Sequence, residues 1–390
     1  MDFEARRAIE ALRSGIPSRH IGGYFTSART EMLAGLSEWL DSAAGGGKII
    51  TGNYGEGKTH LLNTVFTMAR NKNMAVSMIS LSKETPFNQL HLVYQKIALN
   101  TYLPGREQPG FSYLLDTLGS LEMAELQLYA GKELQTDKLY YLLKAYCGTD
   151  NPEYKFILQA DLCGDFIQNP ALKKLYMDII GDKIVFSANF AKTRHIEDYF
   201  HFLRRLFSLS GLGGWIILFD EAEHIGRLGR KSRFKAYSNI SKFFRPGMKN
   251  IFTLFAMHES YSKEVIEGKN ERLYLSQAED VDKESAEEAL SLIESAPELS
   301  PLRSDELMEV IGKILRFHAK AYDWQPGIDA EGLNALVRSR GFLLRTKIRA
   351  AIEILDQLYQ YGDTGAITTG ALDQERYTEE IPLPEDLPGM

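Results

Sequence analysis

Short, mostly apolar runs alternate with amphipathic stretches along the first 260 residues. The runs are Lys48–Thr51, Met74–Ser80, Trp215–Phe219 and Asn250–Met257. Runs of this length and composition are typical of strands buried on both faces of a parallel sheet. Lys58–Asn71 instead places its apolar residues at helical spacing. The pattern predicts an α/β fold, a parallel sheet flanked by helices, with Arg272–Ser276 as a candidate fifth strand.

The remaining pattern divides the chain into parts. From about 87 to 210 it is mostly helical, with no clear strand, and from about 283 to 361 it is again helical. We predict a helical entry at 1–47, a core at 48–280 that carries a helical insert at about 87–210, a helical lid at 281–361, and an acidic, proline-containing tail at 362–390.

Composition narrows the class of protein. The chain is 44% hydrophobic and 25% charged, which is typical of a soluble globular protein. It contains no apolar run of the roughly 18 residues that a membrane span needs, and its first residues lack the apolar centre of a secretory signal. The two cysteines, Cys147 and Cys163, have no metal-ligand spacing around them. We therefore expect a cytoplasmic protein without membrane contact.

Gly52–Thr59 reads G-N-Y-G-E-G-K-T and matches the P-loop pattern G-x-x-x-x-G-K-[ST] at every fixed position. Glycines let the backbone curl so that its N–H groups point at phosphate oxygens, and the following helix directs its positive end at the same anion. Lys58 is expected to reach the β- and γ-phosphates, and the hydroxyl of Thr59 to ligate Mg²⁺. We predict ATP and Mg²⁺ as cofactors. The predicted nucleotide-binding residues are Gly52, Asn53, Tyr54, Gly55, Glu56, Gly57, Lys58, Thr59 and His60.

Two acids follow the apolar run Trp215–Phe219. Asp220, at the tip of a buried strand, is placed to hold Mg²⁺, and Glu221 is placed to deprotonate the attacking water. Because a pure phosphate-transfer enzyme would not need both acids, the pair favours hydrolysis. The segment Asp220–Glu223 also spells the D-E-A-E of a helicase box. A helicase motor usually needs two such cores, however, and this chain holds one P-loop and one acid motif.

A polar residue also ends the last predicted strand. In P-loop ATPases whose sheet inserts a strand between the two motif strands, such a residue senses the γ-phosphate. His258 is the candidate for that role and Thr253 the alternative. His258 is explained equally well as a polar residue that only makes structural hydrogen bonds at the end of the strand.

The block Thr51–Leu62, T-G-N-Y-G-E-G-K-T-H-L-L, resembles the P-loop family of ATP-binding proteins in BREX-type phage-defence operons. An early glycine entry (Ile21–Gly23), the strand end Ser80–Ser82 and the F-D-E-A-E segment Phe219–Glu223 fit the same pattern. The similarity runs from about residue 15 to 360. It implies an AAA+-like ATPase that acts with other defence proteins and with DNA.

Gly341–Arg345 (G-F-L-L-R) is similar to the sensor arginine segment of AAA+ lids, in which a glycine opens a helix that lies over the nucleotide. The similarity implies that Arg345 contacts the γ-phosphate, with Arg349 as the competing choice. An arginine on a solvated helix face is the plain alternative. Arg245 lies just before the last predicted strand, where AAA+ arginine fingers tend to be, and is predicted to act across the interface of an ATP-dependent homo-oligomer.

Charge is uneven along the chain. The net charge is −7, which is unusual for a dedicated nucleic-acid binder, yet Arg227–Lys249 holds eight Lys or Arg and no acid. The interleaved Phe234 and Tyr237 suggest a surface that faces DNA. Two other interpretations remain open: the cations pair with the acidic stretch Glu279–Glu288 of a neighbouring subunit, or they solvate a helix face.

Three functions fit these observations. The leading one is an ATP-hydrolysing AAA+-like motor or remodeller in phage defence, completed by a neighbouring subunit. The second is a slow signalling switch in which ATP binding changes partner contacts and turnover resets it. The third is an ATP-gated DNA-binding loader.

Overall fold

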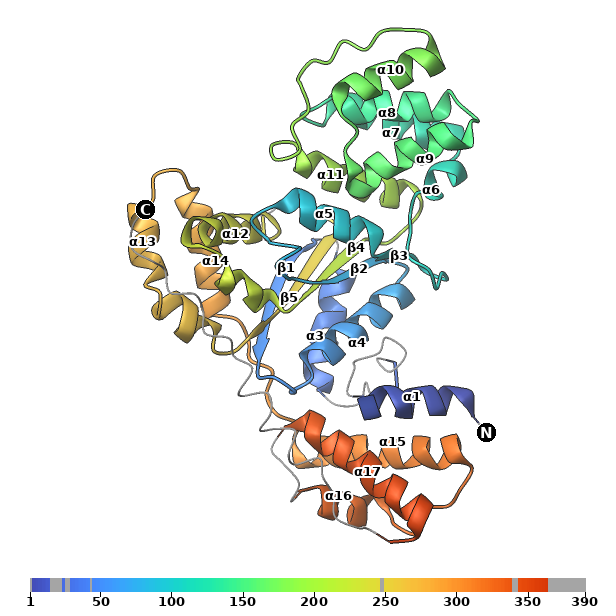
Figure 1. The fold of residues 1–390 in the computed structure, drawn as a ribbon, viewed down its shortest axis with the longest axis vertical. Coiled ribbons are helices and arrows are strands. Elements are labelled where there is room, and N and C mark those ends of the chain that lie inside the picture. The colour runs from blue at the N-terminus through green and yellow to red at the C-terminus, as the bar shows by residue number, and fades with distance from the viewer. Residues whose placement is uncertain are drawn as a thin grey trace.

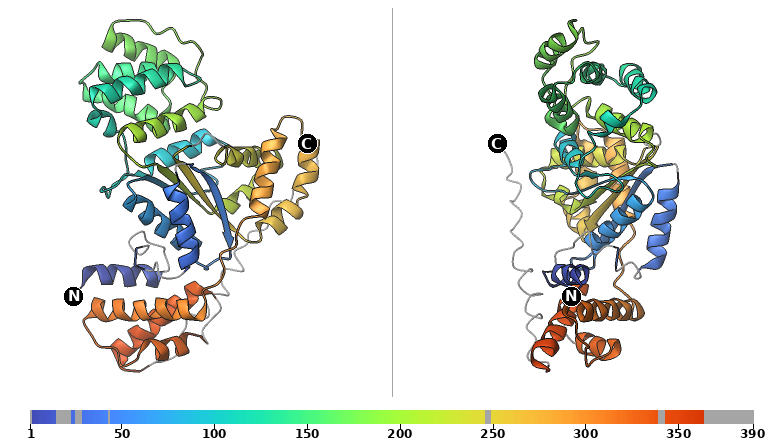
Figure 2. Two further views of the ribbon diagram at one scale, coloured as in Figure 1. Left: turned by 180° about the vertical axis from the view of Figure 1, so that it is seen from behind. Right: turned by 90° about the vertical axis from the view of Figure 1, so that its right-hand side faces the viewer.

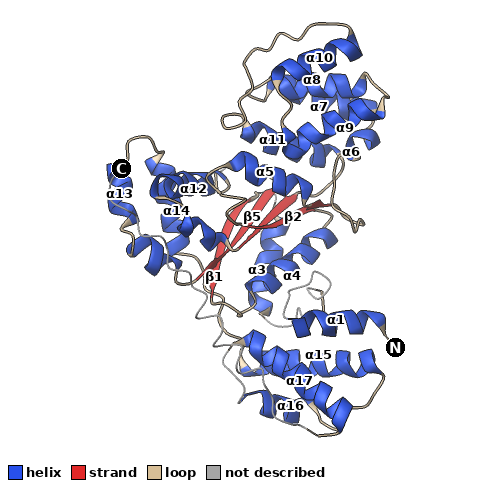
Figure 3. Cartoon of the chain, in the orientation of Figure 1, coloured by secondary structure: helices blue, strands red, loops and turns tan. Residues whose placement is uncertain are grey.

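The computed structural model describes residues 2–14, 23–24, 29–42, 44–245, 249–338 and 343–363. Its centre is a sheet with the strand order β1-β5-β4-β2-β3, in which all neighbours are parallel except β2 and β3. The strands are β1 (Gly46–Gly52), β2 (Ala75–Ser80), β3 (Thr101–Tyr102), β4 (Trp215–Asp220) and β5 (Ile251–His258). Figure 3 shows the sheet enclosed by helices.

All four main strands confirm the expectation of an α/β fold with a mostly parallel sheet. Two details differ. The two-residue strand β3 lies in the stretch expected to hold none. Arg272–Ser276 is not a strand but part of the helix α13 (Glu271–Gln277). The leucines of R-L-Y-L-S alternate, but in a helix two residues are roughly 200° apart, and only Leu275 is buried while Leu273 is 56% exposed.

Helices cover both faces of the sheet (Figure 1). Successive residues of β4 point to opposite sides, so Ile216 and Leu218 pack with one core and Trp215 and Ile217 with the other. The first core includes α3 (Thr30–Asp41) and α4 (Lys58–Asn71); the second includes α5 (Leu90–Leu99), α11 (Ile196–Leu209), α12 (Arg230–Lys242) and α14 (Lys283–Glu294). Burial on both faces explains why the strands are continuously apolar.

The helical insert projects from one end of the molecule (Figures 1 and 2). Between β3 and α11, its elements are α6 (Leu114–Thr117), α7 (Ser120–Lys132), α8 (Lys138–Cys147), α9 (Pro152–Ala160), the π-helical turn η1 (Asp161–Asp165) and α10 (Asn169–Ile180). A wholly buried ion pair joins α8 to η1, because the ammonium of Lys138 lies 2.5 Å from a carboxylate oxygen of Asp161. The hydroxyl of Tyr199 and the amide of Ile167 also donate to Asp161, so this carboxylate ties four segments together.

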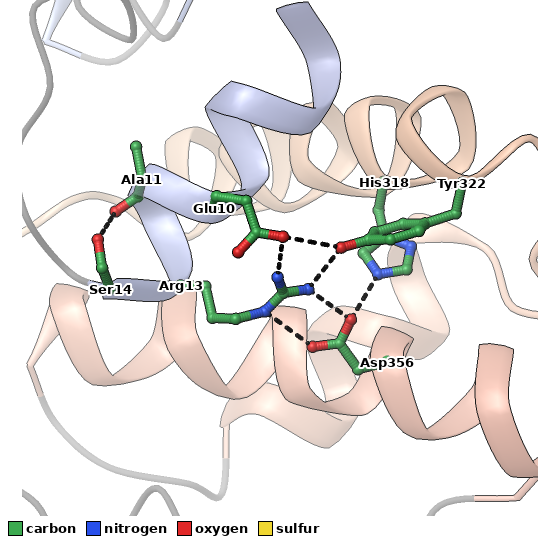
Figure 4. A network of polar contacts seen from close by, with 7 residues as sticks. All are labelled: Glu10, Ala11, Arg13, Ser14, His318, Tyr322 and Asp356. Atoms are coloured by element: carbon green, nitrogen blue, oxygen red, sulfur yellow. Dashed lines mark hydrogen bonds and ion pairs between the residues drawn. The ribbon is translucent and has the colours of Figure 1, made fainter. Parts of the chain in front are cut away.

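At the opposite end of the molecule, α15 (Ser304–Tyr322), α16 (Ala330–Arg338) and α17 (Leu344–Tyr361) form a separate core with α1 (Phe3–Ser14). Arg13 on α1 makes two hydrogen bonds to Asp356 on α17 and one to Tyr322 on α15 (Figure 4). His318 also binds Asp356 through Nε2, at 3.0 Å. Trp324 donates to Nδ1 of His318, so the proton of this neutral ring lies on Nε2 and is donated to Asp356.

The chain enters this end domain along the free edge of β1. The amide of Thr51 donates to Pro297, and the amide of Leu299 donates back to Thr51. These bonds form a short parallel bridge next to the P-loop. The segment that leads into the end domain is therefore fixed directly beside Gly52.

Candidate functional site

Gly52–Thr59 joins the carboxyl end of β1 to the first turn of α4. Gly57 is the N-cap of α4 with φ 94°, and Gly55 has φ 75°, so both occupy the left-handed region that favours glycine. The loop therefore curls at these two positions, and α4 begins at Lys58 as predicted. The amino end of this helix points into the loop, which gives the geometry of an anion site.

Lys58 is buried, and its ammonium lies inside the loop. It donates to the carbonyl of Gly52 at 2.7 Å and to that of Asn53 at 3.0 Å. Burial lowers the pKa of Lys58, and nearby acids oppose that shift, Glu223 most strongly and Asp220 next. A cation in this place is held ready for phosphate oxygens, which would replace the two carbonyls as its partners.

Thr59 and Asp220 meet at the centre of the site. The hydroxyl of Thr59 donates to the carboxylate of Asp220 at 2.7 Å, across 161 residues of sequence. Hydroxyl and carboxylate oxygens are the ligands that Mg²⁺ prefers, and Mg²⁺ usually keeps several waters, so two protein oxygens suffice. The pair therefore fits Mg²⁺. Within the described part of the chain, no group of three His, Cys, Asp or Glu could hold a metal by itself.

The two glutamates of the acid motif lie in different surroundings. Glu221 has φ 54°, and its side chain is 54% exposed, with a carboxylate oxygen 3.9 Å from Nε2 of His224. Glu223 lies two residues further on, in the 3₁₀ turn η2 (Ala222–Arg227), and its Oε2 is buried with no hydrogen-bond partner. Burial raises the pKa of both carboxyls, while Lys58 opposes the shift in each.

His258 ends β5, the strand that lies between β1 and β4 as expected. It pairs in register with Gly52, and its ring lies 4.5 Å from the ring of Tyr54. Its Nδ1 makes a hydrogen bond with the hydroxyl of Ser260. Thr253 lies five residues earlier in β5, roughly 16 Å from its carboxyl end, so the structure removes it as the alternative sensor.

The end domain touches the P-loop directly through Arg345 and is linked to it through Arg29, the second of which no sequence pattern indicates. The amide of Arg345, in the first turn of α17, donates to the carbonyl of Gly55 at 3.2 Å. Arg29 donates through its guanidinium to the carbonyls of Glu56 (2.7 Å) and Ser300 (3.0 Å), and through its backbone amide to Glu306 of α15. Arg29 therefore links the P-loop, the connecting segment and the end domain.

The remaining predicted residues lie as follows. Arg345 begins α17 beside the P-loop, whereas Arg349 is one turn further along that helix. Gly341 and Phe342, on which the resemblance to a lid helix also rests, lie outside the described residues. Arg245 is half exposed and binds Asp282 and Ser285 of its own chain.

Only part of the basic segment Arg227–Lys249 is exposed, which corrects the expectation that its two aromatic residues face DNA; contact of its exposed cations with DNA stays a prediction. Arg233 is 1% exposed and is paired with the buried Glu271. Phe234 and Tyr237 are buried in the core, so neither can stack on a base. The segment is largely α12, and a helix with cations spread around its circumference turns some of them inward, where they need partners.

Other cations of the segment also have partners. Lys242 pairs with Glu197 at 2.7 Å, and Arg230 lies over the ring of Tyr274 at 3.6 Å. Arg227, Lys231, Lys235 and Lys249 are exposed. Pairing within the chain therefore accounts for Arg233, Lys242 and Arg245, and at Arg245 the acidic partner belongs to the same chain.

Comparison with known proteins identifies relatives of this chain. The family described as "BREX system ATP-binding protein BrxC/D" matches residues 2–136 and 191–368, which is most of the chain. The unmatched stretch, 137–190, corresponds to α8, α9, η1 and α10 of the insert. No curated protein matches the chain.

The solved structures that match the chain include the Walker-type ATPase PABY2304 of Pyrococcus abyssi. The identity is 13% and the TM-score 0.37, over 88% of this chain and 71% of the other. At that TM-score the similarity is too low to indicate a shared function. No helix among the described residues is long and apolar enough to cross a membrane.

Proposed function

This chain belongs to the family of BREX system ATP-binding proteins BrxC/D, and from that premise we propose that it binds ATP with Mg²⁺ on Gly52–Thr59 and hydrolyses it. We propose further that it is an AAA+-like ATPase of the cytoplasm, whose partners are other proteins of the phage-defence system. In this proposal α15–α17 act as the helical lid, and the insert is a separate module on the opposite side of the sheet.

The contact between Thr59 and Asp220 carries the proposal. It brings the end of the P-loop and the tip of β4 to 2.7 Å, although β5 separates their strands in the sheet. A bound Mg²⁺ would neutralise charge on the phosphates, and Thr59 and Asp220 are the residues that would hold it. Lys58 binds phosphate oxygens, and the glycines at 55 and 57 allow the backbone amides to do the same.

The contacts of the end domain suggest how nucleotide state reaches the rest of the molecule. Arg29 and Arg345 bind carbonyls of the P-loop at Glu56 and Gly55. If phosphate binding moves these carbonyls, the hydrogen bonds to Arg29 and Arg345 change with them. A motor or remodeller needs such a link between its site and a movable domain.

The test is ATP turnover by the purified full chain, with and without Mg²⁺, together with binding of a fluorescent ATP analogue. Lys58→Ala is expected to lose ATP binding, because it removes the cation that the loop encloses. Lys48→Ala is the matched control, since Lys48 is an exposed residue of the same β1 strand. ATP affinity of Lys58→Ala within a few-fold of wild type would refute the proposed site.

A slow nucleotide switch is the second candidate function, and the exposure of Glu221 favours it. The carboxylate of Glu221 lies near His224 and is more than half exposed, so it would have to reorient before it could activate a water at the phosphates. The turnover number separates the two candidates, because motors hydrolyse ATP continuously and switches hydrolyse it about once per signalling event. Turnover well below one per minute in the presence of partner proteins would favour the switch.

A further inference from the structure

The acid motif of this chain contains a second glutamate, Glu223, that the motif pattern does not assign. The two glutamates are separated by one residue, but their surroundings differ. Glu221 adopts φ 54°, a left-handed conformation that a non-glycine residue adopts at an energetic cost. This conformation turns the chain between β4 and η2. The side chain of Glu221 is more than half exposed, whereas one carboxylate oxygen of Glu223 is buried.

The side chain of Glu221 makes its contact with the following turn. It is 54% exposed, and its carboxylate lies 3.9 Å from Nε2 of His224, a residue of η2.

Glu223 has the opposite surroundings. Its Oε2 is buried and makes no hydrogen bond with any described residue. An unpartnered buried carboxylate oxygen is costly, and native proteins rarely retain one without a use. One oxygen of the Glu223 carboxylate is therefore a hydrogen-bond acceptor that no described residue of the protein uses.

The position of Glu223 in the chain brings it close to the P-loop. It lies three residues after Asp220, whose carboxylate accepts a hydrogen bond from Thr59. Burial lowers the pKa of Lys58, and Glu223 opposes that shift more strongly than Asp220 does. Burial in turn raises the pKa of Glu223, and its own backbone amide and Lys58 oppose that shift. The carboxylate is thus near enough to the P-loop lysine for the two charges to act on one another.

We propose that Glu223, rather than Glu221, accepts the proton of the water that attacks the γ-phosphate. The proposal rests on the ATPase function proposed above. The water oxygen forms a bond to the γ-phosphorus, and the bond from this phosphorus to the bridging oxygen breaks, with its electron pair left on ADP. One proton of the water passes to a carboxylate oxygen of Glu223. Asp220 stays with Thr59 as a metal ligand, so the two acids have separate tasks.

The experiment compares Glu223→Gln with Glu221→Gln in the full chain. For each variant, binding of a fluorescent ATP analogue and single-turnover hydrolysis of ATP with Mg²⁺ are measured. Glu223→Gln is expected to bind the analogue within a few-fold of wild type and to hydrolyse ATP roughly 10²–10⁴-fold more slowly. Glu221→Gln is expected to slow hydrolysis far less than Glu223→Gln does, because the carboxylate of Glu221 is more than half exposed.

Glu223→Asp adds a test against a purely structural role. A shortened carboxylate can still accept a proton, so this variant is expected to be faster than Glu223→Gln, although slower than wild type. Equal loss in both variants, or loss of analogue binding in Glu223→Gln, would mean that Glu223 only supports the fold and would overturn the proposal.

The remaining outcomes distinguish a wrong assignment of Glu223 from a wrong assignment of the ATPase function. Fast hydrolysis by Glu223→Gln with slow hydrolysis by Glu221→Gln overturns the assignment to Glu223 and leaves the ATPase function intact. A wild-type protein that binds the analogue but never hydrolyses ATP, alone or with partner proteins, overturns the function itself, and the assignment falls with it.

Discussion

Replacing Asp161 by Asn should destabilise the helical insert more than any other single charge-neutralising change there. Asp161 is wholly buried and accepts from Lys138 (2.5 Å), Tyr199 (2.5 Å) and the amide of Ile167 (2.6 Å). The amide keeps the size and one acceptor oxygen. It leaves the ammonium of Lys138 buried without a counter-charge, and breaking a buried pair in this way costs about 3–5 kcal/mol.

The loss of stability in Asp161→Asn is limited because Lys138 can give up its proton. Burial already lowers the pKa of this lysine, and Asp161 is what opposes the shift. Without Asp161 the lysine can lose its proton, which limits the cost. A loss of several kcal/mol is still large beside a typical domain stability of about 5–15 kcal/mol. We therefore expect the insert to open locally while the sheet, the P-loop and ATP binding remain.

The assay is amide hydrogen exchange across α8 and η1, together with limited proteolysis of the insert and binding of a fluorescent ATP analogue. Asp165→Asn is the matched control, because Asp165 lies in the same turn but is exposed; we expect it to change stability by less than about 0.5 kcal/mol. Adding Lys138→Met to Asp161→Asn should recover most of the loss, since no charge then remains buried. Exchange protection in Asp161→Asn equal to that of Asp165→Asn would refute this reasoning.

Two further predictions concern the ends of the molecule and its assembly. Arg13→Ala should destabilise the end domain by about 1 kcal/mol at pH 7. Burial acts to raise the pKa of Asp356, but hydrogen bonds from His318 and Arg13 outweigh it and lower the pKa. The ionised carboxylate of Asp356 therefore stabilises the folded end domain fully above about pH 4, the ordinary pKa of an aspartate. This stabilisation is lost as the pH falls through the lowered pKa of Asp356 in the folded protein. Urea unfolding of wild type and Arg13→Ala at pH 7 and at pH 3 checks this, and an equal difference at both values would contradict it. Separately, an Arg245→Ala subunit mixed with a Lys58→Ala subunit should regain part of the ATPase rate if Arg245 completes the site of a neighbour. No complementation at any ratio, with a monomer in ATP by light scattering, would remove that idea.

The sequence predicts most of the sheet and the arrangement of the P-loop because both depend on local signals. Trp215–Phe219 is apolar at every position, which a strand buried on both faces requires, and the fixed residues of Gly52–Thr59 enforce the curl of the loop. Where the local signal is ambiguous the prediction fails. Arg272–Ser276 alternates like a strand, but Glu271 must reach Arg233, and a helix satisfies that contact.

The missed parts of the site depend on contacts between distant segments. Arg29 looks like any exposed arginine in the sequence, and only the folded chain brings it to Glu56 and Glu306. The same holds for the basic segment, in which a count of charges cannot distinguish the buried Arg233 from an exposed lysine. For Glu223 a signal existed, since D-E-A-E contains it. The choice between the two glutamates depends on the backbone angle at Glu221, which no residue pattern specifies.

The docking of α1 against α15 and α17 has a consequence for synthesis of the chain. Arg13 and Asp356 are 343 residues apart. At about 5–20 residues per second, a ribosome needs on the order of 20–70 s to make the partner of a helix that it released first. During that time Ala5, Ala8 and Ile9, all buried in the finished protein, have no surface to cover them. Helix α1 is thus placed long after it has been made, and the cell must keep its apolar side from other chains in the meantime.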